Sequence, residues 1–98
     1  MSTAQRWRQV AMTFHRVAYY VGHHKIPPDF EAEDLQRFLE RNPVTGAERG
    51  VFEFCLHIWD RKQQPFELSQ VIRWDEDHLK AFAAWASGAD TGEPCQYF

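Results

Sequence analysis

The side chains in this 98-residue chain that could do chemistry are five histidines, two cysteines and two groups of carboxylates. Zinc sites combine Cys and His pairs at short, regular spacings. His23 and His24 are adjacent, so they do not easily bind one ion together. Cys55 and His57 are two positions apart, so their side chains would lie on the same face of a strand but not on the same face of a helix. The spacing therefore predicts neither a metal site nor a cofactor.

A catalytic nucleophile is also not indicated. Covalent catalysis needs a Ser or Cys beside a base and an orienting group, but Cys55 lies in an apolar run, where thiols usually serve as inert packing. The segment TGAERG contains Gly46 and Gly50 without a following Lys-Ser/Thr, so it is not a phosphate-binding P-loop. The sequence predicts a protein that is not an enzyme, with a partly buried thiol and solvent-facing histidines.

The carboxylates Asp75, Glu76 and Asp77 form an acidic triplet that is typical of a helix start. Asp75 is a good N-cap, and the two following acids interact favourably with the helix dipole. Trp74 and Leu79 occupy the two positions of a hydrophobic staple. The triplet is thus explained by local structure, although exposed carboxylates at a helix start can also meet a partner.

The elements that position these residues are predicted by apolar periodicity, which indicates an all-α protein, a compact bundle of about five short helices. The first helix carries an uninterrupted apolar stripe from Trp7 to Val21, and Pro27 and Pro28 break the chain after it. We expect helices at residues 4–21, 30–41, 46–61, 65–73 and 76–87.

The segment 46–61 fits two kinds of element. Phe52, Phe54 and Leu56 begin an alternation that is typical of a strand. The same residues also fit helical spacing, and Thr45 with Glu48 forms a potential capping box. A single strand would have no partner to pair with, which favours the helix.

The periodicity also predicts which side chains face the core. The second helix contributes Leu35, Phe38 and Leu39. From the last two helices we expect inward-facing side chains at Leu68, Val71, Ile72, Leu79, Phe82, Ala83 and Ala86.

Length and composition indicate one domain, residues 1–98. From about residue 89 the chain lacks periodicity, and we expect an ordered irregular tail that docks through Tyr97 and Phe98 on its own core or on another chain. Two cysteines forty positions apart, the lack of a signal-peptide core and the lack of an 18-residue apolar run predict a cytoplasmic protein with reduced thiols and no membrane partner.

Charge is distributed unevenly along the chain. Residues 1–25 carry four basic residues and no acid (+4), whereas residues 26–98 carry seven basic and fourteen acidic residues (−7), which gives the total of −3. The basic segment suggests an alternative function, a nucleic-acid-binding accessory protein. Its phosphate contacts would come from Arg6, Arg8, Arg16 and Lys25. Against this, the many acids elsewhere would repel a phosphate backbone, and no basic recognition helix follows.

Protein binding is the leading hypothesis because the acids gather in two clusters. On a rigid bundle these clusters would face a basic surface, and charge complementarity would help to select the partner. Basic surfaces often belong to machines that handle nucleic acids, so we expect a non-enzymatic inhibitor or modulator of such a machine; a homodimer is a third alternative. The expected partner-binding residues are Asp29, Glu31, Glu33, Asp34, Asp75, Glu76 and Asp77.

The C-terminal half carries a recognisable series of aromatic and acidic motifs: Trp59-Asp60, Phe66-Glu67-Leu68, Trp74-Asp75 and Phe82-Ala83-Ala84-Trp85-Ala86. In these motifs residues 51–88 resemble small uncharacterised all-α proteins of bacterial mobile elements. The resemblance implies a helical fold and a mobile-element or phage setting, without an assigned activity. Size, acidity and compactness also resemble anti-CRISPR proteins, which would imply binding to a CRISPR effector and blocking of its nucleic-acid site.

Overall fold

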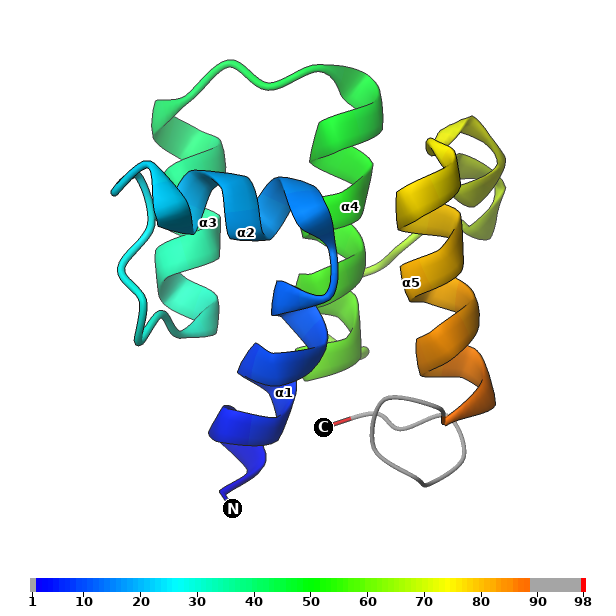
Figure 1. The fold of residues 1–98 in the computed structure, drawn as a ribbon, viewed down its shortest axis with the longest axis horizontal. Coiled ribbons are helices and arrows are strands. Elements are labelled where there is room, and N and C mark those ends of the chain that lie inside the picture. Colours follow the sequence, from blue (N-terminus) through cyan, green and yellow to red (C-terminus); the bar gives the residue numbers. More distant parts are fainter. Residues whose placement is uncertain (1, 89–97) are drawn as a thin grey trace.

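A computed structural model describes residues 2–88 and 98, and its regular elements are helices (Figure 1). No strand occurs in this part of the chain, which confirms the all-α prediction and the helix after Thr45. The elements are α1 (Thr3–Met12), α2 (His15–Gly22), α3 (Ala32–Arg41), α4 (Gly46–Trp59), the 3-10 helix η1 (Leu68–Arg73) and α5 (Glu76–Ser87).

The helix ends lie close to where their capping residues predict them. Ser2, Thr45 and Asp75 each accept the backbone N–H of the third residue of the helix that follows. Gly88 ends α5 with a φ of 78°, a left-handed conformation that glycine adopts without strain. Local side-chain chemistry is therefore sufficient to set these boundaries.

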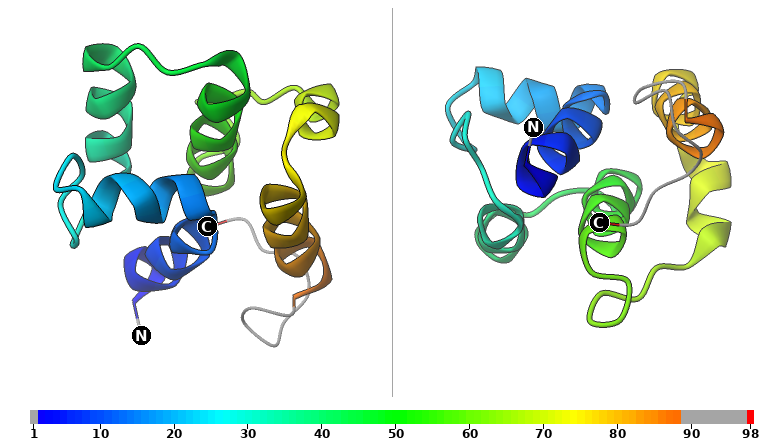
Figure 2. Two further views of the ribbon diagram at one scale, coloured as in Figure 1. Left: turned by 45° about the horizontal axis from the view of Figure 1, so that its top comes forward. Right: turned by 90° about the horizontal axis from the view of Figure 1, so that it is seen from below.

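The single helix predicted over residues 4–21 is wrong, because the chain bends and forms α1 and α2. Phe14 has an extended backbone (φ −83°, ψ 113°), and α2 runs across the molecule at an angle to α1 (Figures 1 and 2). The bend takes the apolar stripe around a corner, so that Phe14 and Val17 are fully buried. The apolar stripe correctly predicts that Phe14 and Val17 are buried. It does not reveal the bend, because the apolar residues have the same helical period before and after Phe14.

Helix α4 lies between α3 and the segment formed by η1 and α5 (Figures 1 and 2). From α1, Trp7 packs against it and donates its indole N–H to the Cys55 carbonyl at 2.8 Å. On the other side, the ring of Phe54 lies 5.3 Å from Phe82 and 5.0 Å from Trp85 of α5, measured between centroids. Because α4 has neighbours on several sides, its buried residues are Gly50, Val51, Phe52, Phe54, Cys55, Leu56 and Ile58.

The helix predicted at 65–73 is shorter and is a 3-10 helix, and two of its three expected core residues are not in the core. Val71 is buried, whereas the exposed fractions are 67% for Leu68 and 82% for Ile72. In a 3-10 helix successive residues are about 120° apart, so Ile72 points well away from Val71. Leu68 and Ile72 are thus two large apolar side chains of η1 that are exposed to solvent.

Helix α5 begins as predicted, but the expected buried face is wrong. Its buried side chains are His78, Ala81 and Trp85, and Phe82 is partly buried against the core. A polar residue therefore occupies a core position that an apolar pattern cannot show, and this shifts the buried face by about one residue. The expected core residues that are instead exposed are Leu79, Ala83 and Ala86.

The tail predicted from about residue 89 lies outside the described residues, apart from Phe98. The backbone N–H of Phe98 donates to the Ile58 carbonyl at 2.8 Å, and the Arg6 guanidinium lies 5.9 Å from the centre of its ring. The last residue thus contacts α4 and α1 of its own chain. Among the described residues, none of the helices has the length and apolarity that crossing a bilayer requires.

Candidate functional site at the start of helix α5

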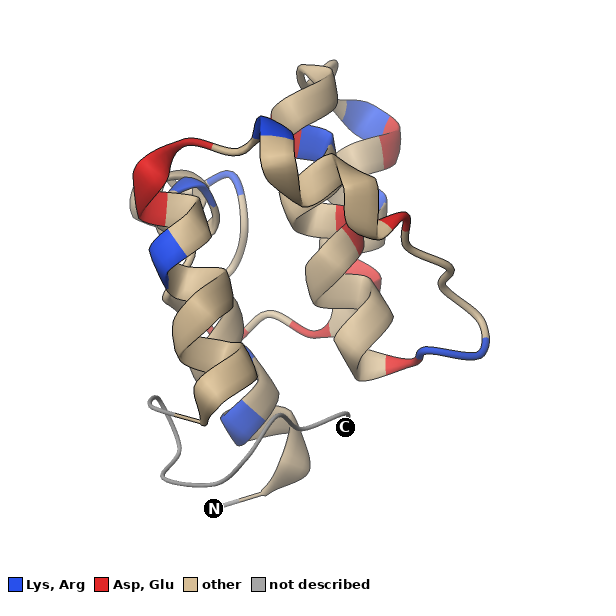
Figure 3. Cartoon of the chain, turned by 90° about the vertical axis from the view of Figure 1, so that its right-hand side faces the viewer, with Lys and Arg blue, Asp and Glu red and all other residues tan. Residues whose placement is uncertain are grey.

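The acidic triplet predicted as a partner site lies at the exposed start of α5 (Figure 3). The side chains of Asp75 and Glu76 are 53% and 81% exposed. Glu76 pairs with Lys80 at 3.4 Å, a surface ion pair that contributes little to stability. Asp77 makes no hydrogen bond or ion pair with any described residue, so its carboxylate is free to meet a partner.

The other predicted cluster is used mainly to build α3. Asp34 accepts the backbone N–H of Glu31 at 2.8 Å and pairs with Arg37 at 3.1 Å. Glu33 and Asp29 are exposed. The starts of α3 and α5 lie on different sides of the molecule, with α4 between the two helices (Figures 1 and 2). The structure therefore does not combine the seven predicted acids into one surface.

Two histidines that the sequence analysis did not select meet at the start of α5. The Asp75 carboxylate lies 3.0 Å from His15 Nε2 through Oδ2, and 3.0 Å from His78 Nδ1 through Oδ1. The two imidazole rings stack with centroids 4.0 Å apart and planes 18° apart. His15 begins α2 and is 60 positions from Asp75, so no local spacing could have revealed this group. We call it the His15–Asp75–His78 joint.

The hydrogen bonds of His78 determine its tautomer. Its Nε2 accepts the backbone N–H of Arg16 at 3.2 Å, so Nε2 carries no proton. A neutral imidazole then has its proton on Nδ1, which donates to Asp75. Phe14, the residue before α2, makes no side-chain cap. His78 of α5 therefore caps the start of α2, because an early N–H of a helix has no partner within that helix.

Burial and charge act on the pKa values of the joint. The pKa of His78 lies below its ordinary value of 6.5, first because burial disfavours the charged imidazolium and then because of repulsion from His15. The Asp75 carboxylate raises it, but does not compensate. The pKa of Asp75 itself is lowered, mainly by the hydrogen bond from the His78 backbone and also by that from His15. The joint therefore favours an ionised Asp75 beside a neutral His78.

A small hollow of about 220 Å³ lies beside the joint. Arg16 Nε lies 3.3 Å from a carboxylate oxygen of Glu48, and the Tyr20 hydroxyl donates to the same carboxylate at 3.1 Å. Burial, followed by the hydrogen bond to Glu48, raises the pKa of Tyr20. The hollow is lined by Arg16, Thr45, Ala47, Glu48, Arg73, Trp74, Asp75 and His78.

The basic residues predicted for nucleic-acid binding point to several parts of their own chain. Arg8 Nε donates to the Phe30 carbonyl at 2.8 Å, Arg16 pairs with Glu48, and Arg6 contacts the ring of Phe98. Lys25 lies at a separate hollow of about 210 Å³ near the end of α3. The structure does not bring these four side chains together into one basic patch.

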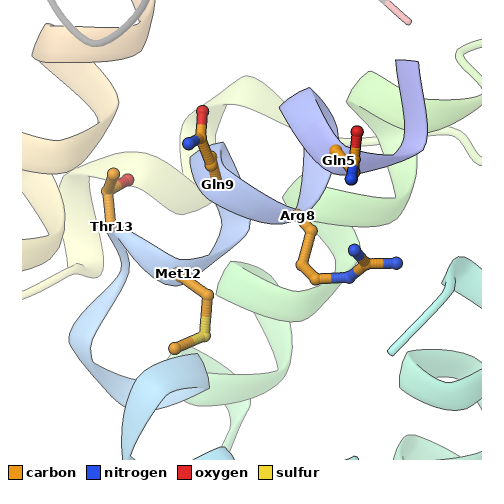
Figure 4. Close-up of a pocket in the computed structure, with 5 residues that line it drawn as sticks. All are labelled: Gln5, Arg8, Gln9, Met12 and Thr13. Atoms are coloured by element: carbon orange, nitrogen blue, oxygen red, sulfur yellow. The ribbon is translucent and has the colours of Figure 1, made fainter. Parts of the chain in front are cut away.

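A hollow of about 620 Å³ opens along α1 (Figure 4). It is wide and shallow, and Arg8 is the one charged residue among the described residues that line it. The others are Gln5, Gln9, Met12 and Thr13. The Thr13 hydroxyl donates to the Val10 carbonyl at 2.6 Å, and the described side chains that line the hollow include no carboxylate, histidine or lysine that could act as its base.

Compared with known protein families, with curated protein sequences and with solved structures, the chain shows no significant match. Its function must therefore be inferred from the surface chemistry described above.

Proposed function

We propose that this protein binds a basic protein partner through the η1–α5 surface, defined as Leu68, Ile72, Asp75, Glu76, Asp77 and Leu79. In this proposal it acts as a non-enzymatic inhibitor or modulator of a nucleic-acid-handling machine. The sharpest form is an anti-CRISPR-like protein that covers the nucleic-acid site of a CRISPR effector.

The observation that carries the proposal is the exposure of Ile72 beside the acidic triplet. Its side chain is 82% exposed, and Leu68 on the same short helix is 67% exposed. Large apolar side chains that lie together on a surface often mark an interaction site. Protein interfaces typically place such residues at the centre and charged residues at the rim. Within one stretch of thirteen residues, 68–80, the chain supplies both.

The acids indicate the chemistry of the partner. Asp77 has no partner among the described residues, and Asp75 and Glu76 lie beside it on the outside of the molecule. Carboxylates in this position complement lysines and arginines, and such complementarity accelerates association and selects partners. Proteins that bind nucleic acids expose basic surfaces for the phosphate backbone. An acidic protein on such a surface would compete with the nucleic acid without any chemical reaction.

The test is capture followed by measured affinity. The tagged protein is incubated with bacterial lysate with and without nuclease, and the nuclease-resistant partner is identified by mass spectrometry and purified. Binding of the wild type is then compared with that of Ile72→Asp and Asp77→Lys. We expect Ile72→Asp to weaken binding by roughly tenfold or more, as for a central interface residue. Asp77→Lys should mainly slow association and reduce its dependence on salt.

A matched control is Glu33→Lys, which reverses an exposed acid at the start of α3, on another side of the molecule. Its affinity should equal that of the wild type. If all three variants bind the captured partner equally well, the η1–α5 surface is not the binding site.

A further inference from the structure

The His15–Asp75–His78 joint is the one place among the described residues where a neutral imidazole caps a helix from a distant part of the chain. We propose that this joint is a proton-sensitive connection: it holds the start of α2 against the start of α5 while His78 is neutral, and it opens when His78 becomes an imidazolium. The inference does not depend on the proposed binding function, because it concerns contacts within the chain.

The hydrogen-bond geometry makes protonation and closure incompatible. His78 Nε2 accepts the Arg16 N–H at 3.2 Å, while Nδ1–H donates to Asp75. A second proton on His78 must be added to Nε2, because Nδ1 already carries one. This proton would place the Nε2–H of His78 opposite the backbone N–H of Arg16. Because both groups are donors, Arg16 and the start of α2 must move away. An uncapped N–H at a helix start then needs water as its new partner.

An imidazolium at this position would keep Asp75 as its acceptor at Nδ1, whereas its Nε2–H would face the Arg16 N–H, which is itself a donor. The residue is 4% exposed, and its ring centroid lies 6.1 Å from that of Phe14 and 6.4 Å from that of Trp74. A buried donor that is left without an acceptor is costly. Protonation is therefore expected to occur together with opening and not in the closed joint.

Charged groups face His78 from every element packed around it. Asp75 on its own helix favours the imidazolium, and Glu48 of α4 lines the adjacent hollow. His15 and Arg16 of α2 oppose it, and Arg73 of η1 lines the same hollow. The carboxylate of Asp75 is already shared among the His78 backbone, the His78 ring and His15. Burial, together with the opposing effects of His15 and Arg16 on α2, outweighs this attraction and favours the neutral form.

A metal ion would use the same donors, but the geometry does not favour it. His15, Asp75 and His78 offer ligand atoms within 4.8 Å of one another. An ion on His78 Nδ1 would require the proton on Nε2, which already accepts the Arg16 N–H. The nearly parallel stacked rings also direct their in-plane lone pairs along separate planes, 4.0 Å apart between centroids. The closed arrangement therefore suits a proton better than a divalent cation.

Opening would loosen one end of α5. The C-terminal half of this helix is held by Phe82 and Trp85 against Phe54, whereas its first turn is tied to α2 by the joint. Loss of the joint would free the first turn of α5, while the buried Val71 and Trp74 keep η1 and the residue after it in the core. If the η1–α5 surface binds a partner, acid would weaken that binding as a secondary effect.

The experiment is an NMR titration of the full-length protein from pH 7.5 to pH 5. It follows the ring signals of each histidine and the hydrogen-exchange protection of the Arg16 amide, expressed relative to an unstructured peptide at the same pH. We expect His78 to titrate below pH 6.5, the ordinary value for histidine. Arg16 protection should fall with the same midpoint by roughly two- to tenfold, the factor that corresponds to one hydrogen bond.

Three variants separate this joint from general acid sensitivity. His78→Gln retains an acceptor oxygen near the position of Nε2 and cannot titrate, so Arg16 protection should no longer depend on pH. His15→Ala removes a repelling, exposed imidazole, so both midpoints should move together to higher pH even if the Gln variant folds poorly. His23→Gln changes an exposed histidine outside the joint and should behave as the wild type.

Several outcomes would overturn the proposal. In one, His78 titrates while Arg16 protection stays constant. In another, the His15→Ala change moves only one of the two midpoints. In a third, Zn²⁺ at pH 7.5 raises the melting temperature and shifts the signals of His15 and His78, which would identify the group as a metal site.

Discussion

At the scale of single residues, Asp75 combines several bonds in one carboxylate. It caps α5, accepts a hydrogen bond from His78 Nδ1–H and contacts His15. The cap could be predicted from the sequence, because an Asp before a helical pattern is a local signal. The contact with His15 could not, because 60 residues separate the two side chains. Local sequence therefore predicts the cap in the candidate site, whereas the contact with His15 depends on the tertiary structure.

The cap predicts a difference between two substitutions at Asp75. Asp75→Ala should lower the free energy of unfolding by about 1 kcal/mol, the usual effect of losing an N-cap, whereas Asp75→Asn should lower it less because Asn also caps well. Urea unfolding at pH 7.5 measures both. Equal losses would show that the charge, and not the cap, carries the effect.

The lowered pKa of Asp75 adds an acid dependence with a defined sign. The stabilisation that the Asp75 carboxylate provides is complete above pH 3.8, the ordinary pKa of a carboxyl group. It is lost as the pH falls through the lower pKa that Asp75 has in the folded state. Asp75→Asn should therefore reduce the loss of stability between pH 5 and acid. The test is a series of melting curves, in which parallel pH profiles for the two proteins would contradict the expectation.

Cys55 is a second residue whose environment predicts its reactivity. The side chain is fully buried, and burial raises the pKa of the thiol. Because the thiolate is the reactive form, the native protein should resist alkylation at this position and react once it is unfolded. A Cys95→Ser background leaves one thiol to follow by mass spectrometry. Rapid labelling in native buffer would show that α4 is open to solvent.

At the scale of elements, helix boundaries that depend on neighbouring residues in the sequence could be predicted. Thr45 and Asp75 predict the starts of α4 and α5, and the structure confirms both caps. The bend at Phe14 has no such signal, since neither proline nor glycine is present. It is explained by packing: an extended residue there allows both α1 and α2 to place their apolar sides on α4. The face of α5 was misjudged for a related reason, because His78 occupies a core position.

The packing of η1 on α4 predicts a strong position dependence for glycine substitutions in α4. A Cβ at Gly50 would lie 3.3 Å from Nε1 of the buried Trp74 and 2.6 Å from Oε1 of Gln70, the movable end of a flexible side chain, whereas a Cβ at Gly46 has open space around it. Gly50→Leu should destabilise the protein by about 1–3 kcal/mol through overpacking. Gly46→Leu is the matched control and should change stability by at most about 0.5 kcal/mol, as at an ordinary surface position. Thermal or urea unfolding measures both, and similar losses would mean that η1 does not press on α4.

At the scale of the whole molecule, three of the four basic residues in the N-terminal segment interact with other parts of the chain. Arg6, Arg8 and Arg16 each interact with groups of their own chain. We therefore expect no gel shift with single- or double-stranded nucleic acid at physiological salt. Arg8→Ala should instead lower stability by about 1 kcal/mol or more, because the Phe30 carbonyl loses a charged donor. Salt-sensitive binding that is weakened by these substitutions would restore the nucleic-acid hypothesis.

The joint gives the whole molecule a stability that depends on pH near neutrality. Because the folded-state pKa of His78 is below 6.5, the unfolded chain takes up this proton first as the pH falls. The free energy of unfolding should then decrease from about pH 6.5 downward until the folded-state value is passed, and this part of the decrease should be absent in His78→Gln. Denaturant unfolding at pH 7.5, 6.5 and 5.5 provides the comparison. A wild type that gains stability in this range would contradict the assigned neutral state.

The cap that His78 places on α2 also has a consequence for synthesis of the chain. The acceptor lies 62 residues after the N–H that it caps. During synthesis, α2 leaves the ribosome long before α5 has been made. The Arg16 N–H in its first turn therefore has no His78 acceptor during this time. The first turn of α2 is thus expected to lack this hydrogen bond until the last helix has emerged. A nascent chain halted before residue 75 would be the form most exposed to proteases and chaperones.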